Sequence, residues 1–171
     1  MRHIIDDINA SIAENLLPSL NIKTYGVAES VSVRGDDNVT LPAMVFPDGE
    51  CVSVFSEVDM HDIVLYHRLQ DIAYQEDARM SFGSRSDTYT QTADMALIVF
   101  GKRHSMNQFL VERAARVAIV ANGGALARSD FNALQVFAAE YAGVTYFLGT
   151  DYYLFKINYT LTSTYNARCN K

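Results

Sequence analysis

Two histidines and an aspartate are the side chains whose types and spacing come closest to a chemical motif. His61 and His67 lie six positions apart, and Asp62 follows the first of them. That spacing fits neither the i, i+4 histidine pair of a helical zinc site nor the spacing of a structural zinc site. On a β-strand the two histidines would share one face, so a metal-dependent hydrolase using His61, His67 and Asp62 stays as an alternative. We expect surface or interface histidines and no bound metal.

The other polar residues contain no arrangement that predicts catalysis. Neighbouring acids point apart on a helix and are solvated in a turn, so the adjacent acidic pairs in the chain do not suggest a catalytic dyad. Gly101-Lys102 lacks the upstream glycine and the following serine or threonine of a phosphate-binding loop. We therefore predict that the protein is not an enzyme and uses no cofactor.

Length, composition and charge narrow the class of protein. The 171 residues, 49% of them hydrophobic, suit a single globular domain over residues 1–171. A net charge of -6 argues against tight binding of nucleic acid, which needs concentrated lysine and arginine. No segment approaches the roughly 18 apolar residues of a membrane span, so we expect no membrane partner.

The first third of the chain predicts one helix followed by strands. Isoleucines four positions apart predict an N-terminal amphipathic helix that ends at Pro18. Alternating apolar residues predict one strand from Ile22 to Val33. Residues 39–55 predict a hairpin around the turn sequence "PDG", with Pro42 confining the first strand of the hairpin to an edge or a bulge.

In the middle of the chain, the sequence pattern does not decide between helix and strand over residues 56–78, but it predicts a strand clearly over residues 93–101. Residues 56–78 fit either a helix or a strand; we favour a short helical turn and then a strand from about Asp62 to Arg68. The apolar run "ADMALIVFG" at residues 93–101 predicts a buried strand. The polar residues 82–92 before it predict a loop or a protruding hairpin.

Two further helices precede the last strands. Ser105 and Gln108 form a capping box for a helix that ends at Gly123-Gly124, and Ser129 can cap a second helix over residues 130–142. Because strands and helices do not alternate regularly, the predicted class is α+β. We expect a mainly antiparallel twisted sheet with the N-terminal helix and the two later helices packed on one face, and a long C-terminal strand.

The C-terminal strand is unusually long. Residues 152–165 alternate between apolar side chains, such as Ile157 and Leu161, and mostly polar ones, which is the period of a β-strand. Such a strand would reach roughly 45 Å, against a usual length of about 5 to 6 residues. An exposed edge of that length invites pairing with another chain.

The order and style of these elements resemble a known family. The opening helix, the polar hairpin that leads into "TADMALIVFGKR", the capped helix and the alternating strand "YYLFKINYTLTS" resemble the tail-terminator-like neck and ring proteins of tailed bacteriophages. The Tyr- and Asn-rich style is similar to that of proteins from crAss-like phages. The resemblance covers nearly the whole chain as topology.

The resemblance implies a structural role in a virion. It implies a homomeric ring of twelve or six copies in the neck or tail, assembled in the host cytoplasm, with portal or adaptor proteins above and tail proteins below. DNA would pass through the ring without specific binding, which an acidic lumen would favour. The implied subunit contacts fall on two segments with these residues: Phe82, Arg85, Asp87 and Tyr89 in the polar hairpin, and Tyr153, Phe155 and Tyr159 on the last strand.

Another interpretation from a different class stays open beside the hydrolase. The same composition fits a small ligand-binding or regulatory α+β module of a cellular protein. A ring protein should change its assembly state with concentration or partner, whereas the hydrolase should bind stoichiometric metal and lose it when His61 and His67 are replaced.

Overall fold

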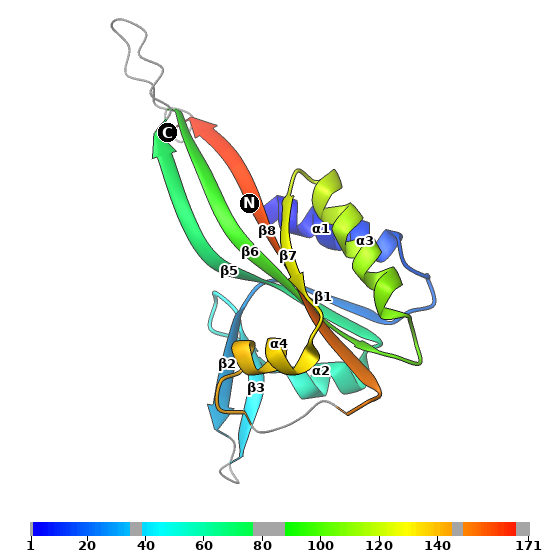
Figure 1. The fold of residues 1–171 in the computed structure, drawn as a ribbon. Helices are drawn as coiled ribbons and strands as arrows, with labels where there is room; N and C mark the ends of the chain where they lie inside the picture. Colours follow the sequence, from blue (N-terminus) through cyan, green and yellow to red (C-terminus); the bar gives the residue numbers. More distant parts are fainter. Residues whose placement is uncertain (1, 35–38, 77–87, 145–148, 167–171) are drawn as a thin grey trace, which may run out of the picture.

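The computed structural model describes residues 2–34, 39–76, 88–144 and 149–166 of the chain (Figure 1). These residues form four helices and eight strands, in the α+β class that the sequence predicts. The elements in chain order are α1 (Arg2–Glu14), β1 (Ile22–Val27), β2 (Glu29–Arg34), β3 (Thr40–Val45), β4 (Cys51–Ser53), α2 (Val54–Met60), β5 (Ile63–Glu76), β6 (Thr88–Lys102), α3 (Gln108–Ala121), β7 (Ala125–Asp130), α4 (Ala133–Glu140) and β8 (Tyr152–Asn166).

A five-stranded sheet in the order β1-β5-β6-β8-β7 is the centre of the molecule. Only the β1–β5 pair is parallel, so the sheet is mixed and mainly antiparallel. The long strands β5, β6 and β8 cross its whole height, and the predicted C-terminal strand is confirmed. β6 lies between the other two and pairs with β8 from Thr88 to Lys102 without a break.

A smaller sheet, β2-β3-β4, corrects the prediction of one strand over residues 22–33. The chain changes sheets at Ala28, which is buried and donates its backbone N–H to the His67 carbonyl at 2.8 Å. The alternation of apolar residues continues across Ala28, so the sequence pattern does not reveal the change of sheet. The predicted hairpin around "PDG" is present as β3 and β4, but the prediction that Pro42 places its strand at an edge or a bulge is wrong, because β3 is the middle strand of the small sheet. The sheet tolerates Pro42 because β3 pairs with β2 alone at that position and β4 begins to pair only at Ala43.

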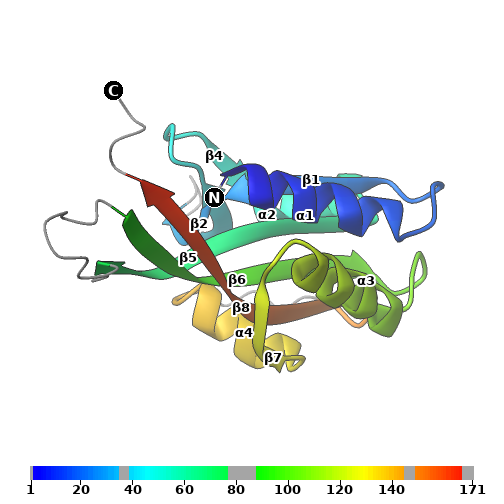
Figure 2. The same ribbon diagram turned by 90° about the horizontal axis from the view of Figure 1, so that it is seen from above.

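Helices cover both faces of the large sheet, which corrects the prediction that they share one face. α1 and α3 lie on one face, and α2 and α4 lie on the other (Figures 1 and 2). Two separate clusters of buried side chains follow from this arrangement. α4 belongs to the second cluster because Val136, Phe137 and Tyr141 pack with Ile98 and Leu154, which point away from α1 and α3.

The helix boundaries follow local capping chemistry. α1 buries Ile5, Ile8 and Ile12, the spacing that predicts this helix. Asn107, rather than Ser105, caps α3, and its side chain accepts from the Phe109 N–H at 2.9 Å. Gly123 follows α3 with φ +82°, so the predicted glycine end is present. Within the described residues, no helix is long and apolar enough to cross a membrane.

Three segments differ in extent from their predictions. The strand predicted at residues 93–101 is β6, which begins earlier, at Thr88, within the predicted loop or hairpin over residues 82–92; the rest of that prediction, residues 82–87, lies outside the described residues. The predicted helix over residues 130–142 is shorter: α4 is capped by Asn132, and β7 occupies the residues before it. The favoured interpretation of residues 56–78 is confirmed as α2 followed by β5, but β5 extends to Glu76 instead of ending near Arg68. Its pairing with β6 over that whole length supplies the hydrogen bonds that a lone strand would lack.

Candidate functional site

The upper part of the large sheet extends beyond the helices as a three-stranded arm (Figure 1). We define the arm as residues 73–76 of β5, 88–92 of β6 and 162–166 of β8, which pair with one another. The core ends directly below it at Ala93 and Leu161, each at most 1% exposed. Above that level no described side chain is buried, and Tyr74 is 63% exposed.

Both outer strands of the arm have an unpaired edge in the part of the chain that the structure describes. β1 pairs with β5 only as far as His67, so the outer edge of residues 68–76 has no strand beside it. β7 pairs with β8 only from Lys156 to Thr160, so the outer edge of residues 161–166 has none either. Unpaired N–H and C=O groups in such a row are a template for another strand.

The two edges run in the same direction on opposite sides of the arm. β5 and β8 are each antiparallel to β6, and they are therefore parallel to each other. An edge of β5 on one copy can consequently pair with the edge of β8 on a second copy in the same orientation. Main-chain pairing of this kind requires no particular side chain.

The residues predicted for the interface fall into two groups. Phe82, Arg85 and Asp87 lie outside the described residues. Tyr89 belongs to β6 at the top of the arm, where its backbone pairs with Tyr165 and Glu76.

Tyr153, Phe155 and Tyr159 instead lie in the core of a single chain. Each is at most 1% exposed and belongs to the cluster that α1 and α3 cover. Tyr153 lies opposite Gly101 on β6, where a β-carbon would overlap its ring. As the structure stands, these three side chains offer no surface to another subunit, and one chain accounts for their apolar character.

His67 belongs to a buried hydrogen-bonded chain between α1, β5 and β8. Its Nδ1 lies 2.5 Å from the Tyr159 hydroxyl and its Nε2 lies 2.9 Å from Asn9 Oδ1. Asn9 donates from Nδ2 to the Tyr25 carbonyl, so Nε2 of His67 carries the proton and Nδ1 accepts from Tyr159. Burial lowers the pKa of His67 to about 3, so the ring is neutral at pH 7.

The proposed hydrolase residues do not come together as a metal site. Both ring nitrogens of His67 are occupied by protein partners, while His61 follows α2 with its Nδ1 3.0 Å from the Glu57 carbonyl. Asp62 accepts from the Ser105 hydroxyl at 2.6 Å and from the Asn21 N–H at 2.9 Å. These hydrogen bonds hold the pKa of Asp62 below its usual value. Among the described residues, no three metal-binding side chains gather at one point.

A buried carboxylate on the opposite face of the sheet was not predicted from the sequence. Glu140, at the end of α4, accepts from Arg68 at 2.6 Å, from Lys156 at 2.9 Å and from Ser30 at 3.0 Å. Burial opposes its ionisation, but the bonds from Lys156 and Arg68 outweigh burial and keep the pKa of Glu140 below its usual value. The group ties α4 to strands β5 and β8 and to the small sheet.

Three hydroxyls extend this network into the core. Ser30 donates to Glu140, so Tyr66 donates to Ser30 at 2.6 Å and Tyr141 donates to Tyr66 at 2.6 Å. Each hydroxyl thus has a partner, and the chain ends on the carboxylate. No sequence spacing links the bonded partners, because the three pairs lie 36, 75 and 110 positions apart.

Comparison with known proteins adds no family to this description. A scan against protein-family models finds no match, and a search of the curated proteins finds none either. The arm and its two unpaired edges are the features of the described residues that bear most directly on function.

Proposed function

We propose that this chain is a structural, non-catalytic subunit that assembles with copies of itself into a ring at the neck or tail junction of a tailed bacteriophage. The observation that supports the proposal is the arm, whose two unpaired edges lie on opposite sides and run in the same direction. The resemblance to tail-terminator-like proteins supplies the virion context.

Two different edges favour a ring over a two-fold dimer. A contact between the β5 edge of one copy and the β8 edge of the next joins different surfaces, and repetition of such a contact closes into a ring when the rotation permits. Because the two edges run in the same direction, all arms in the ring would point the same way. The strands would then form one continuous sheet around the axis.

The composition of the arm suits an edge that pairs only on assembly. Its described side chains on β6 and β8 are Thr, Gln and Ser, such as Gln91, Thr162 and Thr164. A polar edge is less prone to indiscriminate aggregation than an apolar one, while its backbone can still pair with a matching partner. Assembly should therefore depend on the concentration of the chain.

The proposed ring would contact other virion proteins on both sides. Portal or adaptor proteins would lie above the ring and tail proteins below it, and no cofactor is required. The net charge of -6 suits a channel that DNA crosses without adhering, since acidic side chains repel phosphates over about 8 Å at physiological salt.

Disulfide trapping between arms tests the proposal. Ala73 on β5 and Thr162 on β8 are exposed and lie two strands apart in one chain, roughly 10 Å, beyond the Cα separation of about 4.4 to 6.8 Å that a disulfide allows. In a background with Cys51→Ser and Cys169→Ser, the pair Ala73→Cys with Thr162→Cys, or with Thr164→Cys for a shifted register, can therefore link only neighbouring chains. Oxidation should yield a ladder of covalent oligomers that stops at one closed size.

Single-cysteine variants supply the matched control. Ala73→Cys alone has one thiol per chain and can form at most disulfide-linked dimers, so the ladder should be absent from this variant. If neither double variant gives more than dimers at any protein concentration, the head-to-tail pairing of the arms is wrong.

A further inference from the structure

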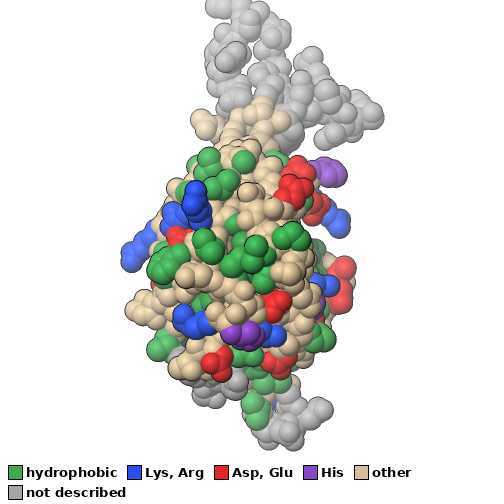
Figure 3. Space-filling model, turned by 90° about the vertical axis from the view of Figure 1, so that its right-hand side faces the viewer, with side chains coloured by type: hydrophobic (Ala, Val, Ile, Leu, Met, Phe, Trp, Pro, Cys, Tyr) green, Lys and Arg blue, Asp and Glu red, His purple; other side chains and the backbone are tan. Residues whose placement is uncertain are grey.

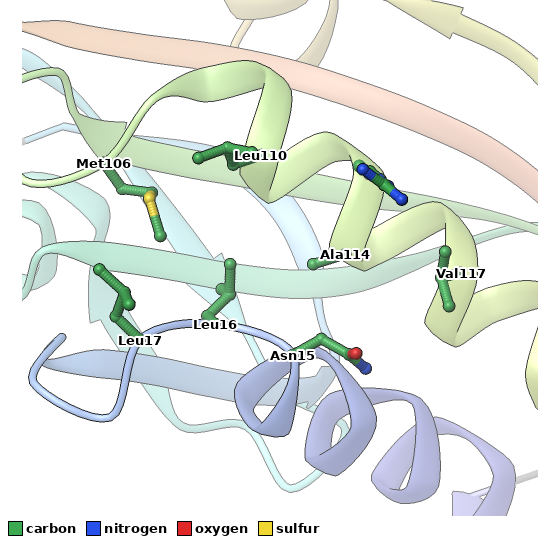
Figure 4. A pocket seen from close by; sticks show the side chains of 8 residues that line it. Asn15, Leu16, Leu17, Met106, Leu110, Ala114 and Val117 are labelled. Atoms are coloured by element: carbon green, nitrogen blue, oxygen red, sulfur yellow. The ribbon is translucent and has the colours of Figure 1, made fainter.

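An open groove between the end of α1 and the first half of α3 has no role in the assembly described above. Its volume is about 540 Å³, and Leu16 and Ala114, both nearly buried, form its floor. Leu17 and Met106 border one end of it and Val117 the other (Figure 4). The groove lies on the face that carries α1 and α3, where hydrophobic side chains gather (Figure 3).

The walls of the groove are large apolar side chains that remain in contact with water. Leu17 is 54% exposed, Leu110 is 52% exposed and Val117 is 50% exposed. Leu110 and Val117 lie seven positions apart on one stripe of α3, which is two helical turns. A contiguous apolar surface of this kind marks an interaction site more often than a scattered exposed residue does.

A single unpaired cation gives the groove a chemical preference. Arg113 lines the groove between Leu110 and Val117 and is exposed. No carboxylate of the described residues forms an ion pair with it, whereas the neighbouring Arg116 is paired with Glu112 at 2.7 Å. A ligand with apolar side chains and one carboxylate would therefore complement both features of the groove.

We propose that this groove binds an amphipathic helix of another protein, one that inserts two or more large apolar side chains and places an Asp or Glu against Arg113. Such a helix presents its apolar side chains at i, i+3 or i+4, and i+7. The half-exposed walls leave the groove open along one side, which suits a helix laid across it better than a small molecule, whose site usually buries most of its surface.

The charge of Arg113 argues against α3 of a second copy of this chain as the occupant, and α1 of a second copy does not fit either. A two-fold pairing of the α3 stripe with itself would bring Arg113 of each copy close to the other, which is repulsive. The outward side of α1 is acidic at Asp6, Asp7 and Glu14 but carries no large exposed apolar side chain, so it lacks the matching surface.

Selection from a peptide library provides a test that does not require the natural partner. The library displays helices of about 18 residues, long enough to be helical, with apolar residues at positions 4, 8 and 11 and all residues allowed elsewhere. Full-length protein is the bait. We expect recovered peptides to be enriched in Asp or Glu beside the apolar stripe, and bait carrying Arg113→Glu to reverse the enrichment to Lys or Arg.

Affinities of the best recovered peptide, measured by fluorescence anisotropy, locate its site. Arg113→Glu and Val117→Asp should each weaken binding about tenfold, because they remove the charge partner and an apolar wall. A Lys in place of the peptide's acid should restore binding to the Arg113→Glu variant. Arg128→Glu and Val39→Asp make the same chemical changes at exposed positions away from the groove and from α3, and should leave the affinity within about twofold.

Several outcomes would overturn the proposal. They are the recovery of no binder, no preference for acidic peptides, or equal effects of the groove variants and their controls. A change in the mass of the protein itself on Val117→Asp, with no peptide present, would assign the groove to self-assembly instead. The groove variants replace exposed side chains, so their urea midpoints should match the wild type and exclude misfolding as the cause.

Discussion

The three long strands pass through two contrasting environments within one sheet. In the lower part of the sheet, helices cover both faces and β1 and β7 pair with both edges, so that Tyr66, Val99 and Phe155 are fully buried. In the arm, no helix of the described part of the chain covers these strands, and no described strand pairs with the outer edges of β5 and β8. The lower part thus has the packing that holds one chain together, and the arm has free hydrogen-bonding groups that suit contacts between chains.

This contrast makes substitutions in the lower part costly and substitutions in the arm nearly neutral for folding. The largest effect should come from Gly101→Ala, because the new β-carbon would overlap the ring of buried Tyr153 on the neighbouring strand. We expect a loss of about 3 kcal/mol in the free energy of unfolding, measured by urea titration. Gly26→Ala has no atom within 4 Å of the new carbon and should change stability by less than about 1 kcal/mol. Equal losses in the two variants would contradict the packing described for β6 and β8.

Acid should weaken the lower part through His67. The pKa of His67 is about 3 in the folded chain against about 6.5 in the unfolded chain, so the unfolded state takes up the proton first as the pH falls. The free energy of unfolding should therefore decline below pH 6.5 by up to about 1.4 kcal/mol per pH unit. The total loss should be roughly 2 to 3 kcal/mol at pH 4.5. Urea midpoints measured between pH 7 and 4.5 test this prediction.

His67→Gln separates this effect from general acid denaturation. The variant should be less stable than the wild type at pH 7, because the buried hydrogen bonds to Asn9 and Tyr159 are disturbed. Its stability should vary less with pH between 6.5 and 4.5. A slope unchanged from the wild type would show that another group governs this range. Glu140, whose pKa is lowered, loses its stabilising contribution only as the pH falls below its unfolded pKa of about 4.5, outside this range.

A smaller loss is expected on the other face of the sheet. Glu140→Gln would leave Arg68 and Lys156 without their shared carboxylate, and both are only partly exposed. We expect destabilisation of about 2 kcal/mol at pH 7, less than for a fully buried pair because water screens the two cations. Glu112→Gln removes the i, i+4 partner of Arg116 near the surface and should cost less than about 0.5 kcal/mol. Chemical denaturation of the two variants side by side checks the difference.

The smallest effect on folding should occur in the arm. Tyr74 is 63% exposed, so Tyr74→Thr should change the free energy of unfolding by less than about 0.5 kcal/mol. Tyr159→Phe, a milder change in the lower part, removes the donor to His67 and should cost about 1 to 2 kcal/mol. If Tyr74→Thr proves the more costly of the two, the arm is part of the folding core and the contrast fails.

Local patterns predicted the strands that these experiments target, because period and capping are properties of neighbouring residues. The alternation around Ile157 identified β8, and the isoleucines of α1 identified its buried face. β7 was missed because "ALARSD" has no alternation, and it is a strand only because it pairs with β8. Residue alternation could not reveal the sheet change at Ala28 either, because the alternation continues from β1 into β2.

The polar contacts were beyond sequence reasoning because their partners are distant in the chain. His67 meets Tyr159 across 92 positions and Glu140 meets Ser30 across 110. His67 is six residues from His61, yet the two have unrelated environments, so spacing alone suggested a site that the fold does not form. The length of β8 did predict an exposed edge, but only the short reach of β1 and β7 reveals that both sides of the arm are open.

The mass of the purified protein in solution, measured by light scattering across a range of concentrations, tests the central claim most directly. The proposal predicts a discrete assembly, six or twelve times the 19.1-kDa chain, that forms as the concentration rises and persists in the Tyr74→Thr variant. A mass of one chain at every concentration, together with no oligomer ladder from the Ala73→Cys and Thr162→Cys or Thr164→Cys pairs, would contradict it.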